Sequence, residues 1–489
     1  MRASACYAFG TMSVVLAAGI FAAAHAQNQG APPIINNPTI GTCNTTPDTN
    51  AGANPPPPKI EPTPIDAKLL TSGQPCQQVV SGKGLTNDTL ANLQRGFDFY
   101  SWLTFIALNS PADGKVIGKG PRPGGDAVTK WESLANYRPL ADVMLPDGAK
   151  PVWGTRIVPQ PCQKFDGPGK IVVTVIEETW NQPFKTGPLI DQYGHYALFD
   201  ILMNKVMFDY IADNNLYSKQ GQAGSRINPI AFPEGVNDDK SKNPGPGKMG
   251  AVMVKVSWRI LDPARDDLSK FHTADALVYF PGPPHNPAPD CVEKKLGLIG
   301  FHVGHKTASA PQWVWTSFEQ VANVPSASDI RNRTLLPRYS FYDAACDLTK
   351  CPPNRTPPDP WPPNTSLTFH DPAFHSQIVR EETLPPFTAD VAELNKSFRA
   401  ILKGTVWENY MLLVTQWPSD HTNPVELTGV PAPTYLANTT LETYSQGTVP
   451  LASSSCMACH GNATDQHVPA LPSDFTFILE KAQPQPAAK

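Results

Sequence analysis

The chain has 489 residues, enough for two or three domains of ordinary size or for one large domain with insertions. Apolar residues make up 40% and aromatic residues 9% of the chain, which excludes wholesale disorder. The net charge is −4, so the basic surplus of a nucleic-acid-binding protein is absent and no nucleic-acid partner is expected.

The N-terminus predicts export. Residues 14–24 form an apolar run that is shorter than the roughly 20 residues of a membrane-spanning helix. Ala24-His25-Ala26 then gives the small-x-small pattern of a signal-peptidase site. We interpret residues 1–26 as a cleaved signal peptide, with a membrane anchor as the alternative. The product is predicted to be periplasmic or secreted, with no stable membrane span after cleavage.

A spacer and a β-rich body are expected next. Residues 27–66 are rich in proline and asparagine and poor in large apolar residues, which predicts a flexible spacer. In the body, residues 67–430, helices are predicted near both ends, over 85–108 and 389–402. Segments rich in Val, Trp and Phe predict strands over 170–177, 195–203, 250–261, 275–280, 294–306, 311–318 and 405–417. Asn204 is expected to cap a short helix. The expected fold class is α+β.

One motif in the C-terminal region, residues 431–489, carries recognisable chemistry: Cys456-Met457-Ala458-Cys459-His460. On one helical turn, two thiols three residues apart can each add to one porphyrin vinyl group, and the following imidazole can reach the iron. The motif predicts a C-terminal helical haem-attachment segment with one covalent haem c. A thioredoxin-like redox pair does not require the histidine, and a zinc site would find only His467 downstream.

The residues around this motif resemble the haem-attachment site of a c-type cytochrome. The resemblance implies that Cys456 and Cys459 form thioethers and that His460 is the proximal ligand of the iron. The whole chain also resembles the large exported bacterial proteins of the cytochrome c family, which implies the haem but no particular activity. Small cytochromes c carry a Met ligand after the motif, whereas here only 29 residues follow His460 and none is Met. A distal ligand must therefore come from earlier in the chain or be absent.

His302 is the candidate distal ligand of the iron. Gly300 and Gly304 flank it on the same face of a predicted strand, and two missing side chains predict a flat slot for a porphyrin. The alternative is a hydrogen-bonded sheet residue beside a bulge. Methionines are the other candidates, although their apolar surroundings favour core packing; they are Met144, Met203, Met207, Met249, Met253 and Met411.

Other residues could complete a haem site. Trp313, Trp315 and Phe318 are interpreted either as apolar cover for a porphyrin or as ordinary sheet core. Lys306 or Arg259 could meet the haem propionates.

The cysteines outside the motif predict disulfides. An exported chain with six such residues suggests three disulfides among 15 possible pairings; they are Cys43, Cys76, Cys162, Cys291, Cys346 and Cys351. Cys346 and Cys351 are close enough in sequence for a local bridge.

Three functions stay open at this point. A haem with two strong axial ligands would make the protein an electron carrier that serves a redox partner protein. Without a sixth ligand, the protein would be a haem-dependent oxidoreductase with an open distal site, and the size of the body favours this. A docking or assembly protein of a larger redox complex is the third possibility. We predict the electron carrier.

Overall fold

The computed structural model describes residues 87–113, 128–225, 227, 229–235, 249–283, 287–307, 310–361, 364–371, 373–381, 387–418, 423, 425, 427, 431–436, 438–446 and 455–486. The predicted signal peptide, the predicted spacer, Cys43 and Cys76 lie outside these residues. Within them, no helix combines the length and the apolarity needed to cross a bilayer.

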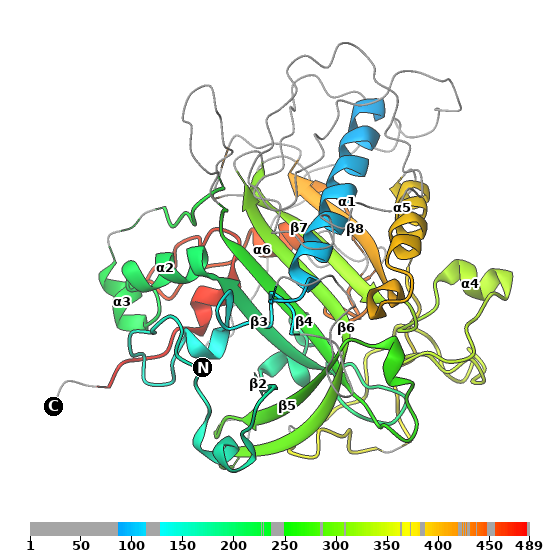
Figure 1. Ribbon diagram of the computed structural model, residues 1–489, viewed down its shortest axis with the longest axis horizontal. Helices are drawn as coiled ribbons and strands as arrows, with labels where there is room; N and C mark the ends of the chain where they lie inside the picture. The colour runs from blue at the N-terminus through cyan, green and yellow to red at the C-terminus, as the bar shows by residue number, and fades with distance from the viewer. Residues whose placement is uncertain are drawn as a thin grey trace, which may run out of the picture.

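The protein is sheet-rich, with helices beside the sheet, as the α+β prediction requires (Figure 1). The strands are β1 (Tyr137–Pro139), β2 (Lys170–Thr174), β3 (Leu198–Asn204), β4 (Val252–Ile260), β5 (Thr273–Phe280), β6 (Asp290–Thr307), β7 (Ala310–Gln320), β8 (Tyr410–Pro418) and β9 (Pro431–Ala432). The α-helices are α1 (Asn87–Asn109), α2 (Lys205–Asp213), α3 (Lys219–Gly224), α4 (Ala327–Asn332), α5 (Phe387–Ile401) and α6 (Cys456–His460).

The sheet is organised around β6. Its strand order is β1-β3-β4-β6-β7-β8-β9, while the first part of β6 pairs with β5, which in turn pairs in parallel with β2. All other described ladders are antiparallel. The part with β5 and β2 curls, as Figure 1 shows, so that β2 comes to lie beside β3 without pairing with it.

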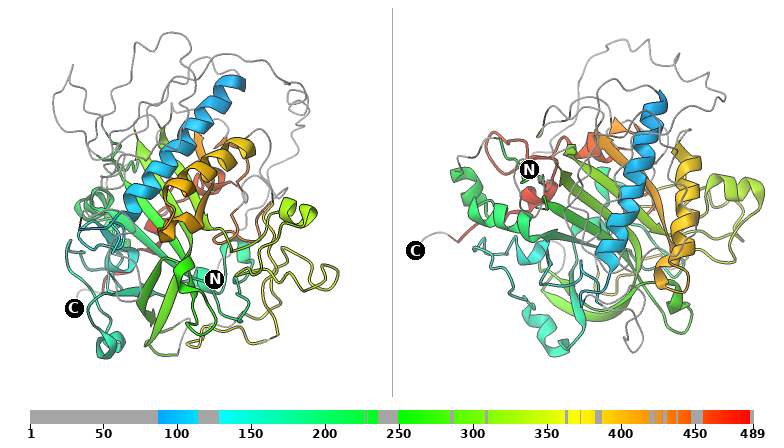
Figure 2. Two further views of the ribbon diagram at one scale, coloured as in Figure 1. Left: turned by 45° about the vertical axis from the view of Figure 1, so that its right-hand side comes forward. Right: turned by 45° about the horizontal axis from the view of Figure 1, so that its top comes forward.

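Helices α1 and α5 cover one face of β7 and β8, and both views of Figure 2 show them side by side. The Trp102 ring of α1 stacks on Phe398 of α5 with 4.9 Å between centroids. Phe105 of α1 stacks on Phe318 of β7 at 4.2 Å. Such aromatic pairs bury a large apolar area, so this face of the sheet is filled by core.

The C-terminal segment packs on the other side of β7. Met457 and Phe475 share a buried apolar cluster with Trp313. Lys306 Nζ of β6 lies 2.6 Å from Asp474 Oδ2 in an ion pair whose side chains are 1% and 0% exposed. The same carboxylate accepts a hydrogen bond from Trp313 Nε1 at 3.3 Å. The residues that follow the Cys-x-x-Cys-His motif are thereby fixed to β6 and β7.

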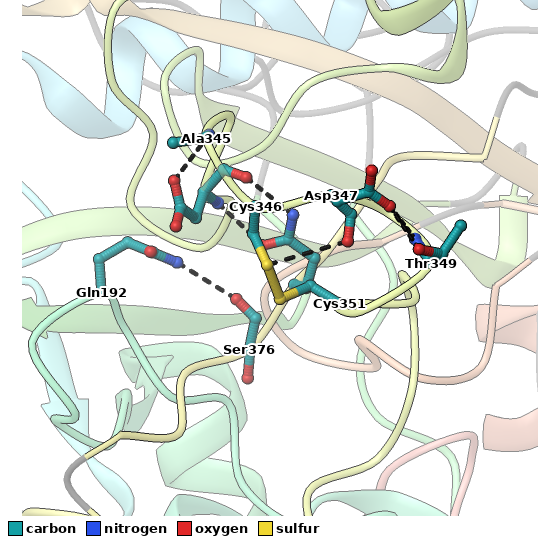
Figure 3. The surroundings of a disulfide bond; sticks show 9 residues. Gln192, Ala345, Cys346, Asp347, Thr349, Cys351 and Ser376 are labelled. Atoms are coloured by element: carbon teal, nitrogen blue, oxygen red, sulfur yellow. Dashed lines mark hydrogen bonds between the residues drawn. A yellow bond between two sulfur atoms is a disulfide. The ribbon is translucent and has the colours of Figure 1, made fainter.

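The predicted local features are found. Asn204 caps α2 by accepting the backbone N–H of Met207 at 3.1 Å. The local disulfide Cys346–Cys351 is confirmed and is shown in Figure 3. A second disulfide, Cys162–Cys291, joins residues 129 positions apart.

Candidate functional site

Helix α6 is short, and two side chains anchor its N-terminal end. Ser455 precedes it and accepts the backbone N–H of Ala458 at 3.2 Å. The side chain of Gln416 on β8 accepts the N–H of Met457 at 2.8 Å and donates to the Ser455 hydroxyl at 3.0 Å. Met457 is buried in the core, whereas Cys456 and Cys459 are only partly buried.

His460 is held by the backbone and by two aromatic rings. Its Nδ1 lies 2.8 Å from the Phe475 carbonyl oxygen. Because a carbonyl only accepts, Nδ1 carries the proton and Nε2 keeps its lone pair. The rings of Trp315 and Phe477 lie 4.4 and 5.2 Å from the imidazole. Burial lowers the pKa of His460 to about 4, so the ring is neutral near pH 7.

A cavity of about 390 Å³ lies between α6 and the sheet, within the usual range of ligand sites. On the helix side its lining includes Cys456, Cys459 and His460. The sheet side includes neighbours on adjacent strands: Ile201, Lys255, His302 and Ser317. These four share one face because the ladder registers place them opposite one another in that order. The structure thus brings the four site residues predicted from the sequence to one cavity: His302, Cys456, Cys459 and His460.

His302 is held by side chains at both ring nitrogens. Its Nδ1 lies 3.1 Å from Ser317 Oγ, and Asn438 Nδ2 lies 3.0 Å from its Nε2. An amide nitrogen only donates, so Nε2 accepts and Nδ1 carries the proton. Asn438 Nδ2 also donates to Glu442, while its Oδ1 accepts the backbone N–H of Thr440 at 3.1 Å, which fixes the amide orientation.

The predicted slot beside His302 is not empty. A Cβ atom at Gly300 would collide with the hydroxyl of Thr440, and one at Gly304 would lie 2.7 Å from Met253 Cε. The two glycines therefore let these side chains approach the strand. The prediction of an open slot was wrong.

Five ionisable side chains that line the cavity were not singled out in the sequence: Glu178, Lys255, Glu442, Glu480 and Lys481. Burial raises the pKa of Glu442, against the opposing effect of Lys255. Burial also opposes ionisation of Glu178, yet Lys255 and Lys481 hold the pKa of this carboxyl below its usual range. Only Lys255 had a sequence signal, because a lysine stands between the apolar residues Val254 and Val256 of a predicted strand.

Of the other predicted haem contacts, only Trp315 and Met253 line the cavity. Trp315 lines the cavity, but Trp313 lies in the adjacent core and Phe318 faces α1. Lys306 is bound to Asp474, and Arg259 forms ion pairs with Asp191 and Asp266 at 2.9 and 3.0 Å. Neither base lines the cavity. Of the predicted methionines only Met253 lines it, while the rest pack in apolar clusters, as the core alternative expects: Met144, Met203, Met207, Met249 and Met411.

Among the described residues, no group of three or more His, Cys, Asp or Glu side chains is arranged to hold a metal ion. A haem iron takes its equatorial ligands from the porphyrin and only axial ligands from the protein. Comparison of the chain with family models, with curated proteins and with solved structures finds no match.

Proposed function

We propose that the protein is an exported c-type monohaem cytochrome that transfers electrons to or from a redox partner protein. One observation carries the proposal: Cys456, Cys459, His460 and His302 line the same cavity although β6 and α6 are far apart in the sequence. A haem bound there would supply a one-electron iron couple.

The residues around the cavity support this assignment. The Phe475 carbonyl fixes the tautomer of His460 that leaves Nε2 able to bind iron. Trp315 and Phe477 hold the ring in place and supply apolar cover. On the sheet side, the Ser317 hydroxyl can accept the Nδ1 proton of the His302 tautomer that has its lone pair on Nε2. His302 would then be able to hold the iron of a bound haem through Nε2 once Asn438 gives way.

A second candidate function is a haem-dependent oxidoreductase with an open distal site. The observation that favours it is the hydrogen bond from Asn438 to His302 Nε2, the nitrogen that would have to bind iron. If this bond persists, His302 stays a hydrogen-bonding group beside the iron, and a small ligand has room to bind.

The test begins with the pigment of the exported protein. Covalent haem resists acid-acetone extraction, whereas a colourless protein or an extractable pigment would refute both functions. A low-spin ferric spectrum unchanged on mixing with cyanide or carbon monoxide is expected for the electron carrier. A high-spin spectrum with rapid ligand binding would support the oxidoreductase.

Variants then assign the distal ligand. His302→Ala is expected to convert the spectrum to high spin, while the exposed His370→Ala is the matched control. Asn438→Ala frees Nε2 and is expected to slow cyanide binding in the electron carrier. Faster cyanide binding in Asn438→Ala, with His302→Ala leaving the spin state unchanged, would support the oxidoreductase.

The proposed export has a separate test. The predicted cleavage after Ala26 would give a mature N-terminus at Gln27. The two described disulfides are compatible with an oxidising compartment. N-terminal sequencing of the purified protein decides, because an intact Met1 would contradict cleavage.

A further inference from the structure

A second and larger cavity lies where the curled sheet does not close. Its volume is about 960 Å³, and it is lined by β2 and β3, two strands that lie side by side without pairing. Figure 1 shows β2 at the curled end of the sheet. The loops 139–146 and 156–161 contribute to its lining. Openings of this kind at the ends of curled sheets are common positions for ligand sites.

Most side chains around this cavity are apolar. Those that contribute to its walls include Trp131, Leu140, Ile157, Ile171, Ile201 and Leu202. Such a lining favours the apolar part of an organic molecule, because binding there removes apolar surface from water.

The charged side chains of the lining are paired, with one exception. Each of five has an oppositely charged or histidine partner within 4.0 Å; these are Glu132, Asp142, Arg156, Lys170 and Lys481. Asp200 on β3 has no such partner in the described part of the chain. Its Oδ1 accepts a hydrogen bond from the backbone N–H of Ile201 at 2.9 Å. Its carboxyl group is therefore the one that a ligand could neutralise.

The surroundings of Asp200 select the sign of that ligand. Burial, with a smaller contribution from Asp142, raises the pKa of Asp200 to about 8. A cation next to a desolvated carboxyl restores the ionised form and gains a charge-assisted hydrogen bond. An anion would instead meet two acidic groups, while the nearby Arg156 and Lys170 already have partners.

The second cavity adjoins the candidate haem cavity. Ile201 and Lys481 line both. A molecule in the larger cavity would therefore lie next to the walls of the smaller one.

We propose that the larger cavity binds an apolar organic molecule that carries one amine, with the ammonium group at Asp200 and the apolar body against the walls between β2 and β3. This site lies outside the haem cavity and does not require the haem. The proposal is therefore independent of the proposed function.

The experiment compares three eight-carbon probes on the full-length protein by isothermal titration calorimetry at pH 7: n-octylamine, 1-octanol and octanoate. Octylamine is expected to bind at least about tenfold more tightly than octanol, as a charge-assisted hydrogen bond predicts. Octanoate should bind most weakly. Asp200→Asn should remove the preference for the amine and leave octanol binding unchanged.

The matched control is Asp209→Asn, which changes an exposed aspartate of α2 that pairs with Lys205 outside the cavity. It should leave all three affinities unchanged. If Asp200→Asn does not fold by circular dichroism, Ile157→Trp replaces it, because it fills the cavity from a loop and should weaken the amine and the alcohol together.

In the wild type, the proposal would be overturned by no binding of octylamine or by equal affinity for the amine and the alcohol. It would also be overturned by an amine preference that survives in Asp200→Asn. If Ile157→Trp is used instead, undiminished binding of the amine and the alcohol would overturn it. The outcome is separable from that of the haem. A colourless protein that prefers octylamine keeps this site and loses the proposed function, whereas a pigmented protein that binds no amine does the reverse.

Discussion

The two histidines of the candidate haem cavity are held in different ways. His460 donates Nδ1–H to the backbone carbonyl of Phe475 and lies against two aromatic rings, so its Nε2 is left for a ligand bond. His302 is bonded at both nitrogens, and both partners, Ser317 and Asn438, are side chains. A mutation cannot remove the backbone carbonyl that holds His460, whereas it can replace either side chain that holds His302. The hydrogen bonding of His460 on the helix side is therefore constant, and that of His302 on the sheet side is adjustable.

The largest effect is expected when the covalent attachment on the helix side of the cavity is removed. In the double variant Cys456→Ala, Cys459→Ala no thioether can form, so covalent pigment should disappear completely from a denaturing gel stained for haem. His302→Ala should keep that pigment, because this residue takes no part in the covalent attachment. Equal loss of pigment in both variants would contradict the difference between the two sides.

The next largest effect concerns the segment that holds His460 through the Phe475 carbonyl. Phe475 follows Asp474, whose buried ion pair with Lys306 ties this segment to β6. Asp474→Asn leaves the Lys306 charge without its carboxylate, which should lower the free energy of unfolding by about 3–5 kcal/mol. Burial raises the pKa of Asp474 to about 7, so urea unfolding is measured at pH 8.

The control for this change is the exposed pair of Lys205 and Asp209. Asp209→Asn removes a solvent-screened ion pair and should change the stability by no more than about 1 kcal/mol. If Asp474→Asn and Asp209→Asn were equally mild, the segment after the motif would not depend on its buried pair.

A third histidine, His305, lies three residues after His302 on β6 and is 1% exposed. Burial lowers its pKa to about 3, below the value of about 6.5 in an unfolded chain. The unfolded state therefore binds more protons between these values, and stability falls as the pH decreases.

This histidine should contribute a loss of about 2 kcal/mol between pH 7.5 and pH 5. The measurement is urea unfolding across this range for the wild type and for His305→Asn. The variant should lack that part of the pH dependence, while the contributions of His302 and His460 persist in both. Identical slopes would show that His305 is not buried neutral.

Local patterns were enough to predict most of the fold. Alternating apolar residues predicted the core strands, and the cap at Asn204 follows from its own side chain. The motif residues follow from covalent spacing. Asn438 and Glu442 could not be predicted, because Asn438 meets His302 only after a loop far along the chain folds over β6, and Glu442 in turn holds Asn438. The partners of Cys162 and Lys306 depend on the same long-range packing.

His302 was predicted as a site residue for a reason that the structure does not support. The flanking glycines suggested an empty slot, but they admit Thr440 and Met253 instead. Strand alternation nevertheless placed His302 on the face that α6 covers, because Lys255, His302 and Ser317 stand opposite one another on three strands. The period of the strand was thus more informative than the composition around the histidine.

The smallest effect is expected when only one hydrogen bond of His302, on the sheet side of the cavity, is removed. Ser317→Ala removes one hydrogen bond to His302 Nδ1 and should cost about 1 kcal/mol in urea unfolding. Ser257 offers a matched control on the neighbouring strand, since its buried hydroxyl has no hydrogen-bond partner among the described residues; Ser257→Ala should be neutral or slightly stabilising. In nitrogen-15 NMR of the labelled histidines, Ser317→Ala should shift the Nδ1 resonance of His302, which loses its hydrogen-bond partner while Asn438 still holds Nε2, and should leave the resonances of His460 unchanged. A change at His460 alone would contradict the assignment of separate anchors to the two rings.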